Sequence, residues 1–160
     1  MKPVAVLLLL LLMLGACGFH LQGRTQLPES IRRIHVDTAD EQSDFVQALR
    51  ESLRSSGAQL ADLPGPTAAT LRISRDRVTE RVLSVSTRNI PTDYELTYEV
   101  EVSVRGAGRE LMAPQELTLS RVYSFDEAHL LAKDREKDIL REALARDMAG
   151  VVLRRLSSLQ

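Results

Sequence analysis

The strongest pattern in the chain is a strict alternation of apolar and polar residues over 93–104. Successive side chains of a strand point to opposite faces of a sheet, so this period of two predicts a long strand with one buried and one acidic or hydroxyl-bearing face. The sequence Gly-Ala-Gly at 106–108 then indicates a turn into a hairpin partner through 117–123. Pro114 predicts that this partner is an edge strand or contains a bulge.

Two segments repeat their apolar residues at helical spacing. Thr38 and Glu41 have the spacing of a capping box and predict a first helix that ends near Ser56, before Gly57. The residues that share its apolar face are Phe45, Val46, Leu49 and Leu53. A second, longer helix is predicted from about Asp126 to the end of the chain. Its apolar residues recur every four positions, at Leu140, Leu144, Met148, Val152 and Leu156.

Two further extended segments complete the pattern. Residues 31–36 are rich in β-branched side chains and predict a first strand. Residues 69–86 predict another, and its apolar positions change parity near Arg75, which indicates a bulge. The order strand, helix, three strands, helix predicts an α+β fold: a four-stranded mixed or antiparallel sheet with two α-helices packed on one face. We expect a single domain over 31–160.

The N-terminus predicts a lipoprotein signal peptide over residues 1–16. Lys2 precedes an apolar run that is too short to span a bilayer, which requires about 20 residues. The run ends in Leu-Gly-Ala-Cys, which resembles the bacterial lipobox, so Cys17 is expected to carry a diacylglycerol and an N-acyl lipid. The alternative is an ordinary secretory signal, but a lone cysteine in an oxidising compartment favours lipidation. Gly18, in place of Asp, favours sorting to the outer membrane, with residues 17–30 as a lipidated N-terminal segment.

Composition excludes several classes of function. The formal net charge of −1 gives no general attraction to nucleic acid, and one cysteine cannot form an internal disulfide. His20, His35 and His129 fall in three different segments without metal-ligand spacing, so no metal site is expected. Nucleophile-elbow and phosphate-loop motifs are missing as well. We therefore do not expect an enzyme.

Basic residues gather in two places. The segment 71–90 carries five arginines against two acidic residues. Most of these arginines can pair across the sheet with glutamates of the next strand, namely Glu95, Glu99 and Glu101. Arg88 instead lies at the predicted hairpin turn, where an exposed guanidinium can meet an anionic ligand. The second place is 133–138, six consecutive charges of alternating sign that are typical of a solvated first helical turn.

Three features together resemble one family. They are Cys-Gly-Phe-His-Leu at 17–21, the hairpin strand over 89–104, and Leu-Ala-Lys-Asp at 131–134 leading into the last helix. The chain resembles the LptE family of lipopolysaccharide-assembly lipoproteins. That resemblance implies a non-enzymatic lipoprotein on the periplasmic side of the outer membrane. Such a subunit plugs and helps to assemble the LptD β-barrel, and assists insertion of lipopolysaccharide into the outer leaflet.

The resemblance also implies a ligand site. Arg88 and Lys133 match basic positions of the family, so these two residues are expected to bind lipopolysaccharide phosphates. A generic outer-membrane lipoprotein adaptor, such as a pilotin or a cell-wall tether, is the alternative that the same anchor and small domain permit.

Overall fold

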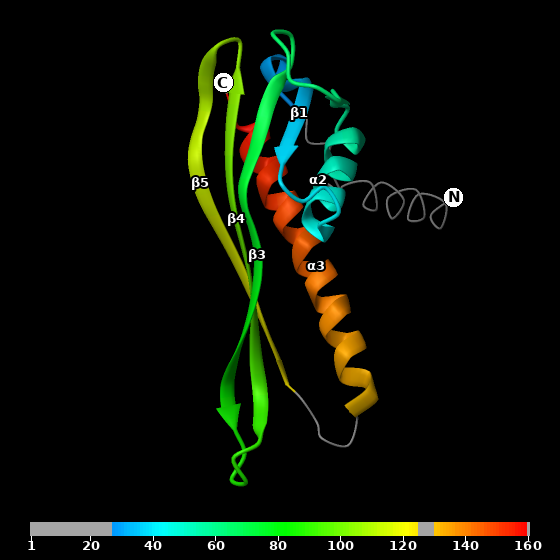
Figure 1. The fold of residues 1–160 in the computed structure, drawn as a ribbon, viewed down its shortest axis with the longest axis vertical. Helices are drawn as coiled ribbons and strands as arrows, with labels where there is room; N and C mark the ends of the chain where they lie inside the picture. The colour runs from blue at the N-terminus through cyan, green and yellow to red at the C-terminus, as the bar shows by residue number, and fades with distance from the viewer. Residues whose placement is uncertain (1–26, 125–129, 160) are drawn as a thin grey trace, which may run out of the picture.

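The computed structural model describes residues 27–124 and 130–159, which form one sheet and two main helices (Figure 1). The elements in chain order are η1 (Glu29–Ile31), β1 (Arg33–Thr38), α2 (Asp44–Ser55), β2 (Gln59–Leu60), β3 (Ala69–Val85), β4 (Pro91–Gly106), β5 (Arg109–Ser124) and α3 (Leu130–Ser157). The sheet order is β2-β1-β3-β4-β5. The α+β class and the two helices are therefore as predicted.

The sheet has five strands, so the prediction of four strands is wrong. The missed strand, β2, has only two residues and pairs in parallel with β1. The Gln59 N–H donates to the Arg32 carbonyl at 2.8 Å, and the Ala61 N–H donates to the Ile34 carbonyl at 2.9 Å. A segment of two residues is too short to show an alternating pattern. It is a strand because β1, which is distant in the sequence, supplies its pairing.

The three long strands form an antiparallel meander. The register between β3 and β4 shifts between Ile73 and Arg75, which confirms the predicted bulge. β5 is an edge strand, and its register against β4 shifts between Val102 and Val104, opposite the segment that contains Pro114. Both expectations for Pro114 are thus confirmed, since an edge and a bulge each tolerate a residue without an N–H donor.

The first helix begins later than its capping-box pattern predicted. β1 continues through Thr38, which pairs with Ile73 of β3, so the backbone at Thr38 is extended. The first strand is correspondingly shifted two residues along the chain from the predicted 31–36. α2 begins at Asp44, and Ser43 is its N-cap, whose hydroxyl accepts from the Val46 N–H at 3.1 Å. The predicted end is confirmed, because Gly57 has a φ of 85°, the left-handed conformation that terminates helices.

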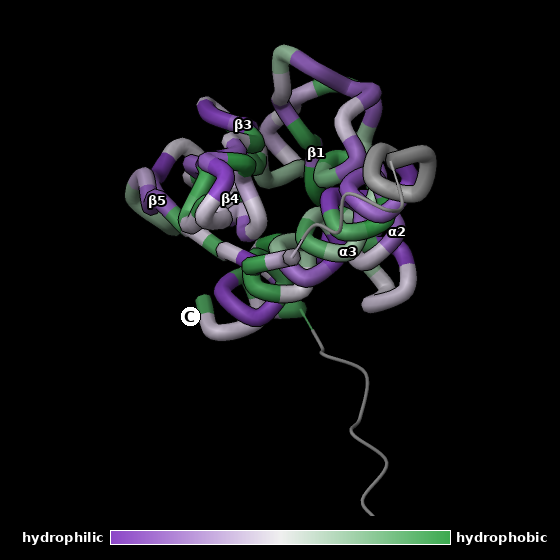
Figure 2. The backbone as a smooth tube through the Cα atoms, turned by 90° about the horizontal axis from the view of Figure 1, so that it is seen from below, coloured by the Kyte–Doolittle hydropathy of each residue, from purple (hydrophilic) through white to green (hydrophobic). Residues whose placement is uncertain are grey.

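Both helices cover the same face of the sheet (Figures 1 and 2). Side chains of α2, α3 and the inner sheet face form one apolar core. Its fully buried large side chains include Phe45, Leu49, Leu53, Leu71, Leu96, Val100, Leu144, Met148 and Leu156. α2 covers only the part of the sheet near β1, whereas the β3–β4 hairpin extends well beyond it, with α3 alone alongside (Figure 1). No helix in the described part of the chain is long and apolar enough to cross a membrane.

Candidate functional site

The turn between β3 and β4 holds Arg88 at the free end of the long hairpin. Asn89 has a φ of 61°, and its N–H donates to the Ser86 carbonyl at 2.9 Å. The Ser86 hydroxyl accepts from the N–H groups of Arg88 and Ile90, both at 3.3 Å. Asn tolerates this left-handed conformation better than most residues. One serine therefore organises the turn, and Arg88 is exposed on it.

A carboxylate cross-links the three strands just below this turn. Asp93 of β4 accepts hydrogen bonds from the hydroxyl of Ser84 on β3 and from that of Ser124 on β5, the latter at 2.7 Å. These two bonds hold the pKa of the Asp93 carboxyl below its usual value. Ser84 also shares a hydrogen bond of 2.7 Å with the Thr92 hydroxyl. The end of the hairpin is therefore braced by side chains as well as by the backbone ladder.

Lys133 lies in the first turns of α3, and its side chain falls outside the described part of the structure. The start of α3 and the β3–β4 turn lie at the same end of the molecule (Figure 1). The fold therefore brings the segments of the two predicted binding residues to one end. Cys17 and His20 lie outside the described residues, as does His129.

Exposed aliphatic side chains surround this end of the sheet. Val82, Leu83 and Val85 of β3 are 48%, 43% and 52% exposed, and Val122 of β5 is 59% exposed. Sequence analysis did not single them out, because strand residues of this type are normally buried. A guanidinium and exposed aliphatic side chains at one end of a domain are two features that suit an anionic amphiphile, which requires a phosphate partner and apolar contacts for its acyl chains.

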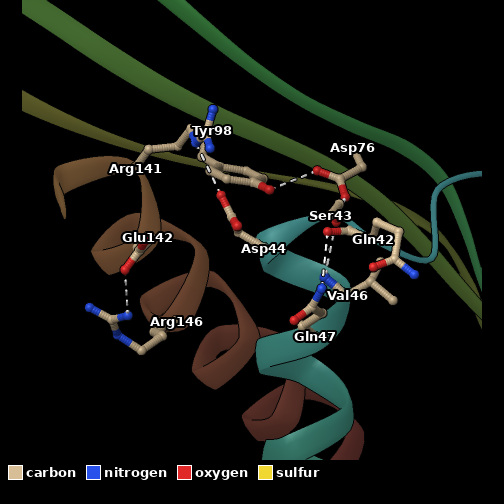
Figure 3. Close-up of polar contacts among 10 residues, drawn as sticks. All are labelled: Gln42, Ser43, Asp44, Val46, Gln47, Asp76, Tyr98, Arg141, Glu142 and Arg146. Atoms are coloured by element: carbon tan, nitrogen blue, oxygen red, sulfur yellow. Dashed lines mark hydrogen bonds and ion pairs between the residues drawn. The ribbon is translucent and has the colours of Figure 1, made fainter. Parts of the chain in front are cut away.

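Two carboxylates on the helix-facing side of β3 attach the hairpin to the helices. Asp76 accepts from the Tyr98 hydroxyl at 2.8 Å and also from the hydroxyl of Ser43, the N-cap of α2 (Figure 3). Burial, and then the bond to Asp76, raises the pKa of the Tyr98 hydroxyl. Glu80 accepts from the Tyr123 hydroxyl at 2.9 Å and pairs with Lys137 of α3.

The charged start of α3 is thus more than a solvated turn, because Lys137 reaches the sheet. Arg141, one turn later, pairs with Asp44 of α2 at 3.0 Å, so α3 is also tied to the first turn of α2 (Figure 3). The alternating charges of the 133–138 run predicted only a solvated first helical turn. The bond from Lys137 to Glu80 depends on tertiary packing, which the charge pattern alone does not specify.

The outer face of the sheet carries the remaining arginines. Arg81 pairs with Glu95 at 2.5 Å, as predicted. Arg75 pairs with Glu116 of β5 at 2.8 Å instead of a glutamate of β4. Arg72 lies 3.9 Å from Asp37 of β1. These exposed pairs each contribute at most about 1 kcal/mol, so they define a polar surface more than they stabilise the fold.

Histidines and carboxylates do not gather into a metal site within the described residues. The His35 side chain contacts the segment that follows β2, and its Nδ1 lies 2.9 Å from the Ala61 carbonyl oxygen.

Comparison with known proteins identifies the family. Residues 31–156 match the family model described as "LptE: Lipopolysaccharide-assembly". The chain belongs to the LptE family. It is 28% identical over 152 residues to the LPS-assembly lipoprotein LptE of Pectobacterium atrosepticum, a match that covers 94% of this chain and 82% of that protein. It is 26% identical to the LptE of Yersinia enterocolitica, covering 94% of this chain and 75% of the relative.

Solved structures of lipoproteins share this LptE fold. The solution structure of lipoprotein B from Nitrosomonas europaea aligns with a TM-score of 0.73 at 26% identity, covering 88% of this chain and 91% of that one. The crystal structure of rare lipoprotein B from Shewanella oneidensis aligns with a TM-score of 0.71 at 27% identity, covering 79% and 94%. Membership of the LptE family identifies an LPS-assembly lipoprotein, and this favours lipopolysaccharide assembly over the generic adaptor.

Proposed function

We propose that this chain is the plug subunit of a lipopolysaccharide translocon. In this proposal the lipid on Cys17 anchors the protein to the periplasmic leaflet of the outer membrane. The domain over 31–160 fills the lumen of an LptD-type β-barrel and assists assembly of the barrel. Arg88 and Lys133 bind lipopolysaccharide while it is inserted into the outer leaflet. No catalytic step is required of the chain.

The observation that carries the proposal is the family match over residues 31–156, which includes both Arg88 and Lys133. The fold adds that the β3–β4 turn and the start of α3 share one end of the domain (Figure 1). Lipid A carries phosphates and acyl chains. This end of the domain has Arg88, whose backbone N–H donates to Ser86 within the turn, and exposed aliphatic side chains. Charge-assisted bonds to phosphate are among the stronger hydrogen bonds in proteins.

The surface of the domain supports the role of a plug. The outer face of the sheet alternates arginines on β3 with glutamates on β4, as in the bonded pair Arg81–Glu95. The lumen of an outer-membrane barrel is polar, so polar groups of the barrel wall can pair with a mixed-charge surface of this kind. Several acyl chains on Cys17 suffice to hold the domain at the membrane, because each buried methylene contributes about 0.8 kcal/mol.

Purification of the tagged, lipidated protein from outer membranes tests the plug function. We expect a very large β-barrel to co-purify in a stable complex. Depletion of the protein is expected to reduce lipopolysaccharide at the cell surface. Recovery of the native protein only as a free monomer would contradict the plug function, and a secretion or cell-shape defect without loss of surface lipopolysaccharide would favour the generic adaptor.

Paired charge reversals test the ligand site. We expect Arg88→Glu with Lys133→Glu to weaken binding of purified lipopolysaccharide at least tenfold, about 1.4 kcal/mol. The matched control is the double variant Arg72→Glu with Arg81→Glu, which changes the net charge by the same amount but on the outer face of the sheet. Equal losses in the two double variants would mean that binding is diffuse or lies elsewhere. Far-ultraviolet circular dichroism of each variant checks that the fold is retained.

A further inference from the structure

β5 presents a long sheet edge that no described element covers. The strand has 16 residues and pairs on one side only, with β4. It lies at the margin of the sheet opposite β1 and β2 (Figure 1). The outward N–H and C=O groups of such an edge can receive another strand, and native proteins usually protect long edges against unwanted pairing.

The backbone features that protect an edge, a proline and a bulge, occur in only one half of the strand. Pro114 and the register shift opposite Val102 and Val104 interrupt the first half of β5. From Glu116 to Ser124 the register against β4 continues without a shift. This second half contains no proline, glycine or lysine. It is therefore a regular, nine-position template for an additional strand.

A basic groove runs beside this template. Its floor combines β5 and α3, and the lining residues are Leu119, Ser120, Arg121, Leu144, Arg146, Asp147, Gly150, Val151 and Arg154. Asp147, the one acidic member, already pairs with Arg121 at 2.6 Å. Arg146 pairs with Glu142, one turn earlier on α3, at 3.6 Å. Arg154 forms no ion pair with any of the described residues. The groove thus has an excess of positive charge next to a strand edge.

We propose that the edge over residues 116–124 binds an extended segment of the barrel partner as a sixth strand of the sheet. The inference rests on the proposed function, which supplies that partner. Alternate side chains of the added strand would point to the helix side. On that side, apolar residues of the segment contact Leu119 and Val151, and acidic residues meet Arg146 and Arg154.

A second copy of the chain fits this edge less well. Symmetric pairing of β5 with β5 would bring two arginine-bearing grooves onto the same face of a continuous sheet. Like charges placed close together oppose association, whereas an acidic segment neutralises them. Charge complementarity therefore selects a different protein with an acidic, extended segment.

Hydrogen exchange of the backbone amides tests the added strand directly. The purified complex with the barrel is compared with the isolated chain, by exchange followed by mass spectrometry. Alternate amides over 117–123, those that face away from β4, are expected to exchange at least 100-fold more slowly in the complex. The amides at the opposite margin, near β2, are the internal control and are expected to change little.

Each other outcome of this experiment overturns the inference in a distinguishable way. An intact complex in which 117–123 exchange as in the isolated chain refutes strand addition and leaves the plug function standing. Failure to form any complex refutes the plug function and this inference together. Concentration-dependent protection of the isolated chain, with a dimer mass in light scattering, assigns the edge to a second copy.

A matched pair of substitutions tests the acidic character of the segment. Arg154→Glu reverses a charge in the groove, whereas Arg155→Glu reverses the adjacent exposed charge, which does not line the groove. We expect the first substitution to weaken association with the barrel at least tenfold and the second to change it less than twofold. Equal effects would refute recognition of an acidic segment at this groove.

Discussion

Replacement of Tyr98 by phenylalanine removes the single oxygen atom that joins β4 to the Asp76 carboxylate. The Tyr98 side chain is only 2% exposed, and its hydroxyl donates to Asp76 at 2.8 Å. Hydrogen bonds to charged groups contribute about 1.5–3 kcal/mol. Asp76 keeps a second donor, the Ser43 hydroxyl, and is partly exposed, so the lower end of that range applies. We expect Tyr98→Phe to lower the free energy of unfolding by about 1.5 kcal/mol at pH 8.

The same structure predicts how this difference depends on pH. Burial, and then the Asp76 bond, raise the pKa of Tyr98 above the value of about 10 that an unfolded chain shows. Between the two pKa values only the unfolded chain releases the phenolic proton, so the stability that this group contributes is fully present below about pH 10 and falls as the pH rises. At pH 11 the loss is about 1.4 kcal/mol for this one group. The phenylalanine side chain of the variant cannot titrate, so the difference between wild type and variant should nearly vanish there.

Urea unfolding at pH 8 and pH 11, followed by far-ultraviolet circular dichroism, measures both effects. The chain contains no tryptophan, so circular dichroism is the more direct signal. Titration of other groups occurs in both proteins and cancels in the difference between them. A difference that stays constant from pH 8 to pH 11 would refute the assignment of a buried phenol with a raised pKa. Equal stability at pH 8 would show that the bond to Asp76 contributes nothing.

Three further predictions follow from single residues. Ser43→Ala removes the N-cap of α2 and one donor to Asp76, and should cost about 1–2 kcal/mol in urea unfolding; wild-type stability in this variant would show that the cap contributes nothing. Gly57→Ala, at a φ of 85°, should cost about 1 kcal/mol, whereas the control Gly65→Ala, in open space, should cost little; equal values would refute the conformational argument. Cys17→Ala, secreted with a substitute signal peptide, should match the wild-type melting temperature but form less barrel complex in cells. An unchanged yield of complex would show that the lipid does not localise the protein.

Two elements with long, regular apolar patterns were predictable from the sequence. Strict alternation over 93–104 predicted β4, and the four-residue repeat from Leu140 to Leu156 predicted the buried side of α3. Both predictions hold because a long element must place one face against the core at every repeat. The bulge near Arg75 and the edge position of β5 were predicted from local chemistry, a change of parity and a proline, which act within a few residues.

Other features depend on contacts between segments that are distant in the sequence, and local patterns do not predict them. β2 exists because β1 supplies its hydrogen bonds, and α2 begins at Asp44 because β3 keeps Thr38 extended. The fold also brings the β3–β4 turn and the start of α3 to one end and leaves the outer edge of β5 without a strand partner among the described elements (Figure 1). Periodicity records which face of an element is buried. It does not record which element lies opposite, because many partners can bury the same apolar face.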